Sequence, residues 1–379
     1  HTIYTLFKPY ENEKPVPPWK LQLGWSPEGY WYPNATRFIP CTIHEFPIYS
    51  YVVADLHGHV SDIPFVILFL GMLVNLGATF GERKKFKEKL IEMAPFGFLL
   101  GVMLMTNTWD LPIYGLVLGA TLLAWMWSRT SFREAVKESV WRMGVVGLVA
   151  FLSAAGFLFQ FEQIAEGIKL VNARSQVYHL LILYGWPLLI SVSWLGLIFI
   201  LKKKNKLVLR EKDYLVSAWL GVSWLLVFIP EVIYVKDIYI AEYHRANTMF
   251  KLVYQAFILF SFAAVYVIWR MVSFKQALNK TGLRIWLLVI GAGLALLAIY
   301  PWLATRSYYG LKEYKGLYGM KFLERGQGDL AAIFWLKKEV KGQPVVLEAP
   351  GDSYTVYNRV SAMTGLPTIV GWAVHEWLW

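Results

Sequence analysis

Charged residues and cysteine are both scarce in this sequence. Only 17% of its 379 residues are charged, whereas a soluble domain carries about 25%. With 56% hydrophobic residues, this deficit excludes an ordinary cytosolic enzyme and a disordered chain. The single cysteine, Cys41, excludes an internal disulfide and a thiolate metal cluster. The sequence also lacks the glycine-rich nucleotide motifs and the H-E-x-x-H zinc motif. It therefore predicts a membrane protein.

Long apolar runs occupy the middle of the sequence. A membrane-spanning helix needs about 20 mostly apolar residues. Eight segments are candidates, of which the second is short: residues 63–80, 94–108, 110–128, 144–160, 178–201, 213–235, 249–270 and 285–303. We therefore predict a polytopic α-helical membrane protein with a transmembrane domain at 63–303, preceded by a loop or interfacial segment at 1–62 and followed by a separate segment at 304–379.

The positive charge is distributed unevenly between the loops. A net charge of +11 would suggest a nucleic-acid partner in a soluble protein. Here nineteen Lys or Arg residues lie in one set of alternate loops (81–93, 129–142, 202–212 and 270–284), against four in the other set (106–110, 161–177 and 236–248). The basic loops are expected in the cytoplasm, against anionic lipid headgroups. We therefore predict a lipid bilayer and no nucleic acid as partner, a cytoplasmic (plasma) membrane location, and residues 1–62 and 304–379 outside.

The C-terminal segment differs in character from the spans. A helix is expected from Asp329, and residues 344–349 and 368–372 are typical of buried strands. This order predicts a small extracytoplasmic α/β domain that is incomplete at residue 379. Ligand groups in such domains tend to lie at strand ends, which places Asp352 and Ser353 at a rim. Four polar residues near the expected strands are candidates for substrate binding, although most such residues are surface or fold determinants: Asp352, Tyr354, His375 and Glu376.

The segment ADLHGHVSD (54–62) places Asp55, His57 and His59 at alternate positions just before the first predicted span. In an extended chain all three would face one way, as an acid/base pair or a metal site requires. In a helix only Asp55 and His59 would share a face. They are candidate catalytic residues and candidate ligands of a divalent metal. The alternatives are a hydrogen-bonded pair and an interfacial segment whose polar groups meet water. Asp62 is placed to cap the span.

Two further acids lie at predicted outer helix ends. Asp110 belongs to the tight turn TNTWD (106–110) and is either a helix cap or a second catalytic acid aimed at the same outer cavity. Glu231 lies near the outer end of the sixth span. We take it as a candidate substrate-binding residue, with an interhelical hydrogen bond as the alternative.

The segment EYHRANTMFK (242–251) combines cations with the start of the seventh span. Arg245, Asn247 and Lys251 lie where a helix N-terminus would meet the membrane interface, which favours binding of an anionic phosphate. The alternative is snorkelling, with an ion pair between Arg245 and Glu242 or Asp237.

Four motifs in this sequence are familiar in combination: HEFPIYSYVVADLHGHVSDIPF, TNTWDLPIY, YHRANTMFKLVYQAF and VVLEAPGDSYTVYNRVSAMTGLPTIVGWAVHEWLW. Together they resemble the uncharacterised multi-spanning membrane proteins of archaea and bacteria called the Chlor_Arch_YYY family. That family is similar to the GT-C glycosyltransferase superfamily.

The superfamily resemblance implies sugar transfer from a polyprenyl-phosphate donor at the outer membrane face. It also implies a catalytic acid in an early outer loop, often with a divalent metal such as Mg²⁺ or Mn²⁺ nearby. Asp55 is the best match for that acid. Family relatives have further spans upstream and continue past the HEW motif, so we expect the sequence to be part of a longer protein, with a catalytic acid upstream of His1 as an alternative.

The combined hypothesis is a GT-C-type glycosyltransferase. Asp55 would take a proton from an acceptor hydroxyl, with His57 or His59 orienting it. Arg245 and Lys251 would hold the lipid phosphate as it leaves. The C-terminal domain would select a glycan, lipid or protein acceptor. A transporter or flippase is a rival, although it would place charges near span midpoints rather than at outer ends. A non-catalytic envelope scaffold is a second rival.

Overall fold

The computed structural model describes residues 30, 32–80, 85–162, 165–206, 208–276, 278–310, 316, 318–325, 327–353 and 355–373. Three predicted binding residues lie outside these ranges: Tyr354, His375 and Glu376. The chain divides into two compact units, His1–Gly310 and Leu311–Trp379.

The first unit is helical. Its elements in order are η3 (Tyr32–Thr36), α2 (Pro47–Val53), α3 (Gly58–Ser61), α4 (Ile63–Thr79), α5 (Phe86–Thr106), α6 (Asp110–Trp127), α7 (Phe132–Leu158), β1 (Ile168–Leu170), α8 (Val177–Lys203), α9 (Glu211–Phe228), η4 (Ile229–Glu231), β2 (Ile233–Val235), η5 (Ala241–Tyr243), α10 (Ala246–Ser273) and α11 (Lys280–Tyr309). Among the described residues eight helices are long and apolar enough to span a membrane, which confirms the prediction.

Helix α7 begins at Phe132, twelve residues before the predicted start of its span at 144, and helix α5 shows the same kind of departure. Apolarity alone starts this span at residue 94, whereas the helix begins at Phe86 and contains Pro95. Its first turns are polar and carry a capping box between Lys85 and Glu88. Such residues suit headgroup depth, where hydropathy does not detect a helix.

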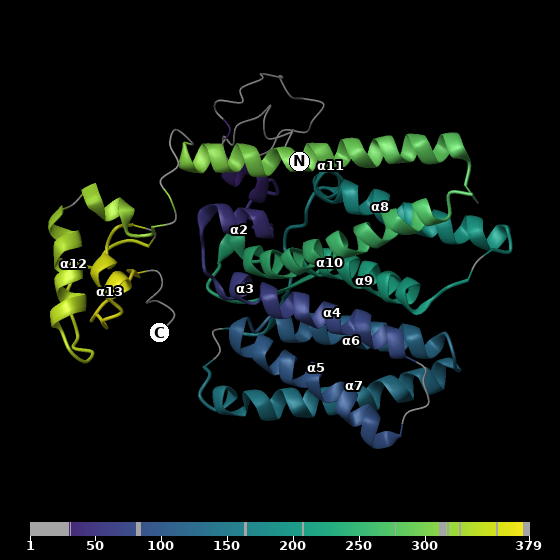
Figure 1. Ribbon diagram of the computed structural model, residues 1–379, viewed down its shortest axis with the longest axis horizontal. Coiled ribbons are helices and arrows are strands. Elements are labelled where there is room, and N and C mark those ends of the chain that lie inside the picture. Colours follow the sequence, from purple (N-terminus) through teal and green to yellow (C-terminus); the bar gives the residue numbers. More distant parts are fainter. Residues whose placement is uncertain are drawn as a thin grey trace. The chain divides into compact units, whose positions relative to one another are not determined.

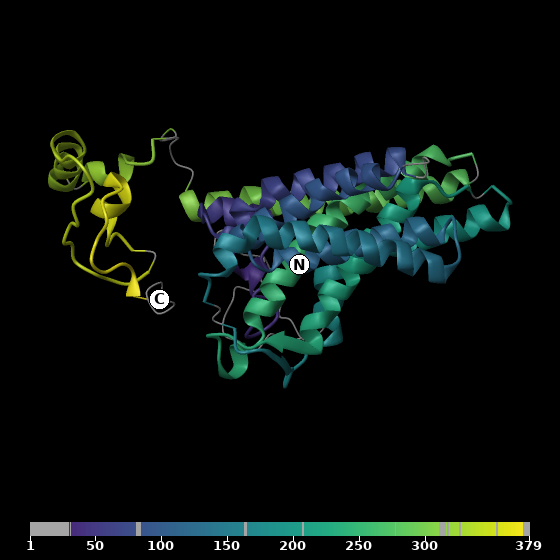
Figure 2. The same cartoon turned by 90° about the horizontal axis from the view of Figure 1, so that it is seen from below.

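The long helices run roughly along one direction, with α4 to α7 forming one group beside α8 to α11 (Figures 1 and 2). Helices α5 and α7 pack especially closely. A Cβ atom on Gly101 would come within 2.0 Å of Ser153 Oγ, and one on Gly97 within 2.6 Å of Val146 O. Small residues therefore allow the two backbones to approach, as is common between membrane helices.

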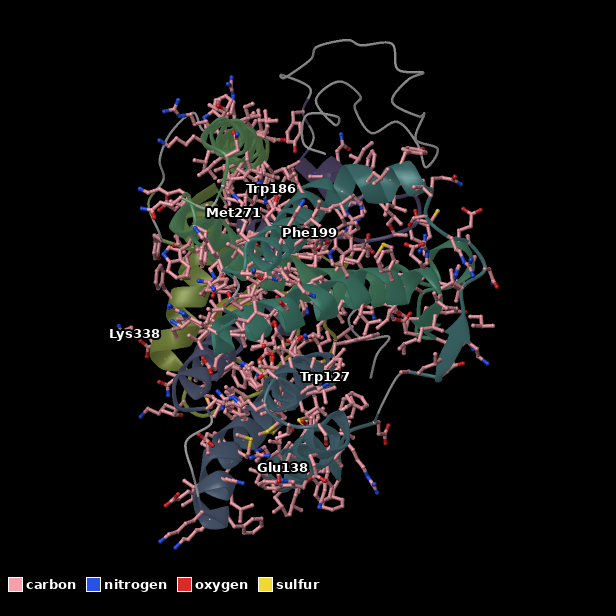
Figure 3. The ribbon with its side chains drawn as sticks, turned by 90° about the vertical axis from the view of Figure 1, so that its right-hand side faces the viewer. Trp127, Glu138, Trp186, Phe199, Met271 and Lys338 are labelled. Carbon is pink, nitrogen blue, oxygen red and sulfur yellow. The ribbon has the colours of Figure 1, made fainter. Side chains whose placement is uncertain are left out.

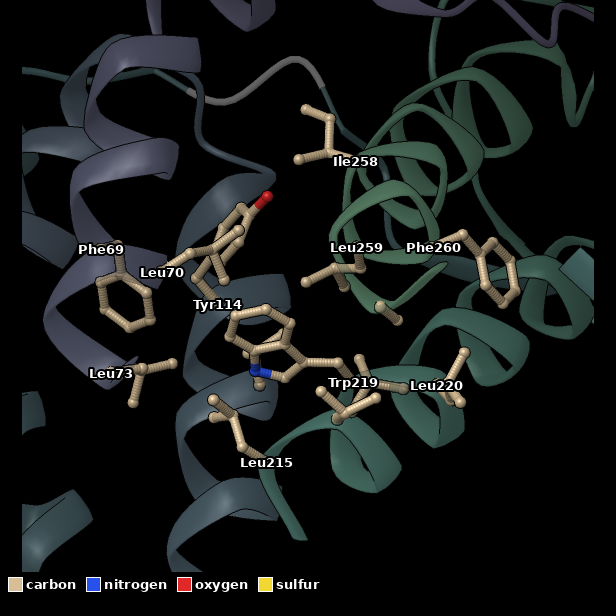
Figure 4. Close-up of a cluster of buried hydrophobic side chains, with 14 of the residues drawn as sticks. Phe69, Leu70, Leu73, Tyr114, Leu215, Trp219, Leu220, Ile258, Leu259 and Phe260 are labelled. Atoms are coloured by element: carbon tan, nitrogen blue, oxygen red, sulfur yellow. The ribbon is translucent and has the colours of Figure 1, made fainter. Parts of the chain in front are cut away.

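The two groups meet through a buried apolar core contributed by α4, α6, α9 and α10. Figure 4 shows Leu70 and Leu73 of α4, Tyr114 of α6, Trp219 of α9 and Leu259 of α10 converging there. The outer faces of the bundle are apolar too, as expected for lipid contact. In α11 only 6% of the most apolar stretch is buried, against 56% in α9 and in α10.

The predicted basic loops gather at one end of the bundle. Arg129 donates to Phe80 O at 2.8 Å and pairs with Glu211 at 2.5 Å, and Lys89 lies 4.0 Å from Glu138. Figure 3 looks onto this end, with Trp127, Phe199 and Met271 among its labelled side chains. We call this the predicted inner end, because its side of the membrane is inferred from charge alone.

At the opposite, predicted outer end, β1 and β2 form a small antiparallel sheet in which Ile168 pairs with Val235. This sheet joins the loop after α7 to the loop after α9, so two loops from different helix groups are held together. The acids and cations singled out in the sequence of this unit lie near these loops and near the start of α4.

The second unit contains η6 (Lys321–Arg325), α12 (Gln327–Glu339) and α13 (Arg359–Thr364). The helix expected from residue 329 is confirmed. The two expected buried strands are not formed in the described residues: only isolated parallel bridges join Val346 with Thr368 and Gly351 with Trp372. The segments are also exposed rather than buried, with Leu347 at 83%. Two strands alone are marginal, and the hydrogen bonds of this region go largely to turns. Asp352 is exposed in one of them.

Candidate functional site

Asp55 and His57 form an exposed pair at the predicted outer end. Helix α2 ends at Val53, and the following residue, Ala54, has a φ of 55° that turns the chain toward α3. The Nδ1 atom of His57 lies 2.5 Å from Oδ1 of Asp55. The side chains are 42% exposed for His57 and 30% for Asp55, so both are accessible. A carboxylate held by an imidazole is suited to proton transfer.

His59 does not join this pair. It lies in α3, is 2% exposed and packs edge-on against the rings of Phe250 and Tyr254. Its Nδ1 atom is 3.5 Å from the ammonium of Lys251. His59 is therefore buried whereas Asp55 and His57 are exposed, although its ring centre lies 5.8 Å from that of His57. In the described part of the chain no group of three His, Cys, Asp or Glu is placed to hold a metal.

Lys251 lies in the second turn of α10. Its ammonium is 4.6 Å from the centre of the Phe250 ring and contacts His59. No ion pair joins Lys251 to an acid in the described residues; the acids whose charges act on it are Asp110, Glu45 and Asp55. A largely buried ammonium with a histidine and an aromatic face as its neighbours can accept an anionic ligand.

Asp110 is fully buried at the start of α6. Its side chain makes no capping bond, and its Oδ1 accepts the amide N–H of Gln255 at 2.8 Å. Gln255 in turn accepts the hydroxyl hydrogen of Tyr114 at 2.6 Å. Polar groups therefore connect α10 to the start of α6, and Asp110 is buried rather than at the surface. The side chain of Asp62 contacts that of Asp110 and makes no capping bond either.

A second polar cluster surrounds Arg245. Its guanidinium pairs with Glu231 at 2.8 Å and donates to Pro230 O and to Ser175 Oγ, each at 3.0 Å. The backbone N–H and hydroxyl of Ser175 both donate to Glu231 at 2.7 Å. The side chains of Arg245 and Glu231 are only 5% and 10% exposed. The ion pair considered for Arg245 therefore forms, but with Glu231 rather than with an acid of its own loop.

Hydrogen bonds also hold the start of α10 against the preceding loop. Asn247 donates to Asp237 at 2.7 Å, and Thr248 Oγ1 accepts the N–H of Val235 in β2 at 2.9 Å. Both side chains therefore fix the helix to the loop before it. In the second unit, Asp352 O accepts the hydroxyl hydrogen of Thr355 at 2.6 Å, which closes a turn.

Glu45 was not singled out in the sequence. Its carboxylate accepts from Arg37 at 3.0 Å, and its charge acts on both Asp55 and Lys251. Burial raises the pKa of Glu45, while the Arg37 guanidinium opposes that shift. The neighbouring His44 is buried, and burial lowers its pKa to about 3. An acid next to an ordinary interfacial aromatic segment carries no sequence signal that separates it from a surface residue.

An apolar groove of about 300 Å³ lies between α4, α9 and α10, with Gly71, Trp219 and Phe262 among its lining residues. Lys212 is its charged member, and none of the predicted site residues line it. Its chemistry suits hydrocarbon rather than a polar ligand. The predicted site residues of this unit therefore lie away from this groove.

Comparison with known proteins gives one match. A family model described as an uncharacterized membrane protein family (DUF2298) matches residues 1–220 and 197–260. No curated protein and no solved structure matches the chain.

Proposed function

We propose, from the premise that the chain belongs to the DUF2298 family of uncharacterized membrane proteins, that it is a GT-C-type glycosyltransferase. It would transfer a sugar from a polyprenyl-phosphate donor to an acceptor at the outer face of the cytoplasmic membrane. The observation that carries the proposal is the exposed Asp55–His57 pair near a largely buried lysine that forms no ion pair in the described residues.

Asp55 is the base in this mechanism. Its carboxylate takes the proton of the acceptor hydroxyl, while the N–H of His57 holds the carboxylate in place at 2.5 Å. The acceptor oxygen then forms a bond to the anomeric carbon of the donor sugar. The bond between that carbon and the phosphate oxygen breaks, and its electron pair leaves with the lipid phosphate.

Lys251 is the group that stabilises the departing phosphate. Its ammonium is held against His59 and Phe250, and carries a positive charge that no ion pair in the described residues cancels. Arg245, the other predicted cation, already donates to Glu231, Pro230 and Ser175. We therefore assign phosphate binding to Lys251 and a positioning role to Arg245, which fixes the loop beside α10.

The remaining predicted residues keep supporting roles in this proposal. Asp110 positions Lys251 and α10 through Gln255. Acceptor selection is assigned to the second unit, where Asp352 is exposed. The described residues bring no three metal ligands together. The assay below therefore tests whether Mg²⁺ or Mn²⁺ is required.

The test is release of lipid phosphate from a panel of polyprenyl-phosphate sugars by the full chain in nanodiscs, with and without Mg²⁺ or Mn²⁺. We expect Asp55→Asn to lower release about a hundredfold. Lys169→Met is the matched control, because Lys169 is exposed on β1 at the same end. Release that neither Asp55→Asn nor Lys251→Met changes would overturn the assignment. Donor flipping without release would favour the flippase rival.

A further inference from the structure

Asp62 and Asp110 face each other at the predicted outer end although they come from different helices. Asp62 joins α3 to α4, Asp110 opens α6, and both are 0% exposed. Their side chains are within hydrogen-bonding reach of each other. One oxygen of Asp110 accepts from Gln255 at 2.8 Å. The other, and both oxygens of Asp62, have no donor among the described residues.

The groups around the pair do not balance two negative charges. Asn107 and Tyr114 approach from α5 and α6, and Gln255 and Lys251 approach from α10. Of these four residues only Lys251 is a cation, so two carboxyl groups face one positive charge. Two ionised carboxylates in contact, with three oxygens lacking donors, would be strongly unfavourable away from water.

We propose that Asp62 and Asp110 together bind one proton, shared between the two carboxyl groups. The protonated acid then donates to the ionised one, so that two of the three oxygens without a donor share one hydrogen. The pair then carries a single negative charge, and Asp62, Asp110 and Lys251 together have a net charge of zero. This assignment does not depend on the proposed transferase reaction.

The surroundings favour a proton over a metal ion. A metal ion requires several oxygen ligands that converge on one point. Here the Gln255 amide presents its N–H to Asp110, and its oxygen is engaged by Tyr114. Two carboxyl groups are enough for a proton. Because Lys251 faces Asp110, an anion bound at Lys251 would cancel its charge and so hold the proton more tightly.

The pair predicts an infrared signature. The chain contains seven aspartates, so labelling with ¹³C-aspartate is selective. At neutral pH the native protein in nanodiscs should show the carbonyl band of one protonated carboxylic acid, and this band should shift with the label. Asp62→Asn and Asp110→Asn should each abolish the band, because the remaining carboxylate then accepts from an amide.

Asp213 supplies the matched control. It is also 0% exposed, but its carboxylate accepts from Arg270 at 2.7 and 2.9 Å and from Tyr266 at 2.8 Å. Asp213→Asn should leave the band unchanged.

Absence of the band from the native protein would overturn the proposal, as would loss of the band in Asp213→Asn. If the band is absent and Na⁺ raises the melting temperature where K⁺ does not, the site holds a metal ion instead. The native spectrum decides even if one variant does not fold.

Discussion

Two polar clusters lie at the predicted outer end, and they differ in how far their members satisfy one another. In the closed cluster, defined as Ser175, Glu231 and Arg245, the guanidinium and the carboxylate bond to each other and to neighbouring groups. In the open cluster, defined as Asp55, His57, His59, Asp62, Asp110 and Lys251, buried oxygens lack donors and the ammonium lacks an acid partner in the described residues.

Comparison of the two clusters identifies the cation that can bind an anionic ligand. Arg245 and Lys251 are six residues apart on one segment, and both are buried or nearly so. A cation whose bonds are complete stabilises structure, because a ligand would have to displace a paired carboxylate. A cation without an acid can bind an anion and gain stability from it. Sequence spacing alone treats the two alike.

The largest expected effect is the loss of the closed cluster. Arg245→Ala should lower the free energy of unfolding by about 3–5 kcal/mol, because it leaves the Glu231 carboxylate buried without its cation. The measurement is thermal or denaturant unfolding in detergent. The double variant Arg245→Met with Glu231→Gln should recover most of the loss. A small effect of Arg245→Ala with a large loss of lipid-phosphate release would reverse the roles of the two cations.

Lys251→Met should show the opposite pattern, with a large loss of reaction rate and a smaller loss of stability. Removing an electrostatic group that acts on the departing phosphate lowers the rate by about 10²–10³-fold. The melting temperature should fall less than in Arg245→Ala, because no ion pair in the described residues is broken and the Asp62–Asp110 pair can take up a second proton when the Lys251 charge is lost. Both quantities are measured on one preparation. Lys251→Arg should restore part of the rate, since it keeps the charge. If Lys251→Met loses as much stability as Arg245→Ala, then Lys251 stabilises the structure as Arg245 does and is not the phosphate-binding cation.

The spans and the grouping of loops at two ends were predictable from the sequence. Hydropathy is local, so residues 63–80 and 249–270 could be identified without knowing what they pack against. Alternation of basic loops then placed Asp55, Asp110 and Lys251 at one end. The contacts of Lys251 with His59, of Gln255 with Asp110 and of Asp55 with His57 agree with that grouping.

The pairing of side chains was not predictable. Glu231 precedes Arg245 by fourteen residues, beyond the loop acids Asp237 and Glu242, and becomes its partner because β2 folds back on β1. Asp62 was expected to cap a helix, yet its carboxyl lies against Asp110 because α4 and α6 start side by side. Such choices depend on helix packing, which a single sequence does not specify.

Protonation of His44 would show whether the buried region near the closed cluster tolerates a new positive charge. It is buried, and its pKa falls to about 3 because burial and the nearby Arg37 and His179 disfavour a positive charge. Below its unfolded pKa of 6.5, the unfolded chain binds a proton that the folded protein does not. Stability should therefore fall by about 1.4 kcal/mol per pH unit from pH 6.5 toward pH 3, or about 2 kcal/mol at pH 5.

The measurement for His44 is the melting temperature at pH 7.5 and at pH 5 for the native protein and for His44→Gln. The variant should lose that part of the pH dependence, while glutamine can still accept the N–H of Ile39 that His44 accepts at 3.2 Å. An unchanged pH dependence would show that His44 is protonated in the folded state.

The smallest expected effect is the loss of one serine hydroxyl, compared between the closed cluster and the neighbourhood of the open cluster. Ser175→Ala should cost about 1 kcal/mol, since it removes one hydroxyl from between Arg245 and Glu231 but leaves their ion pair and the backbone bond in place. Ser50→Ala is the control beside the open cluster, where the hydroxyl of Tyr254 reaches Ser50 over 3.4 Å. That long contact contributes little, so unfolding should not change. Equal losses in the two variants would mean that both clusters depend on complete hydrogen bonding, and the distinction between them would fail.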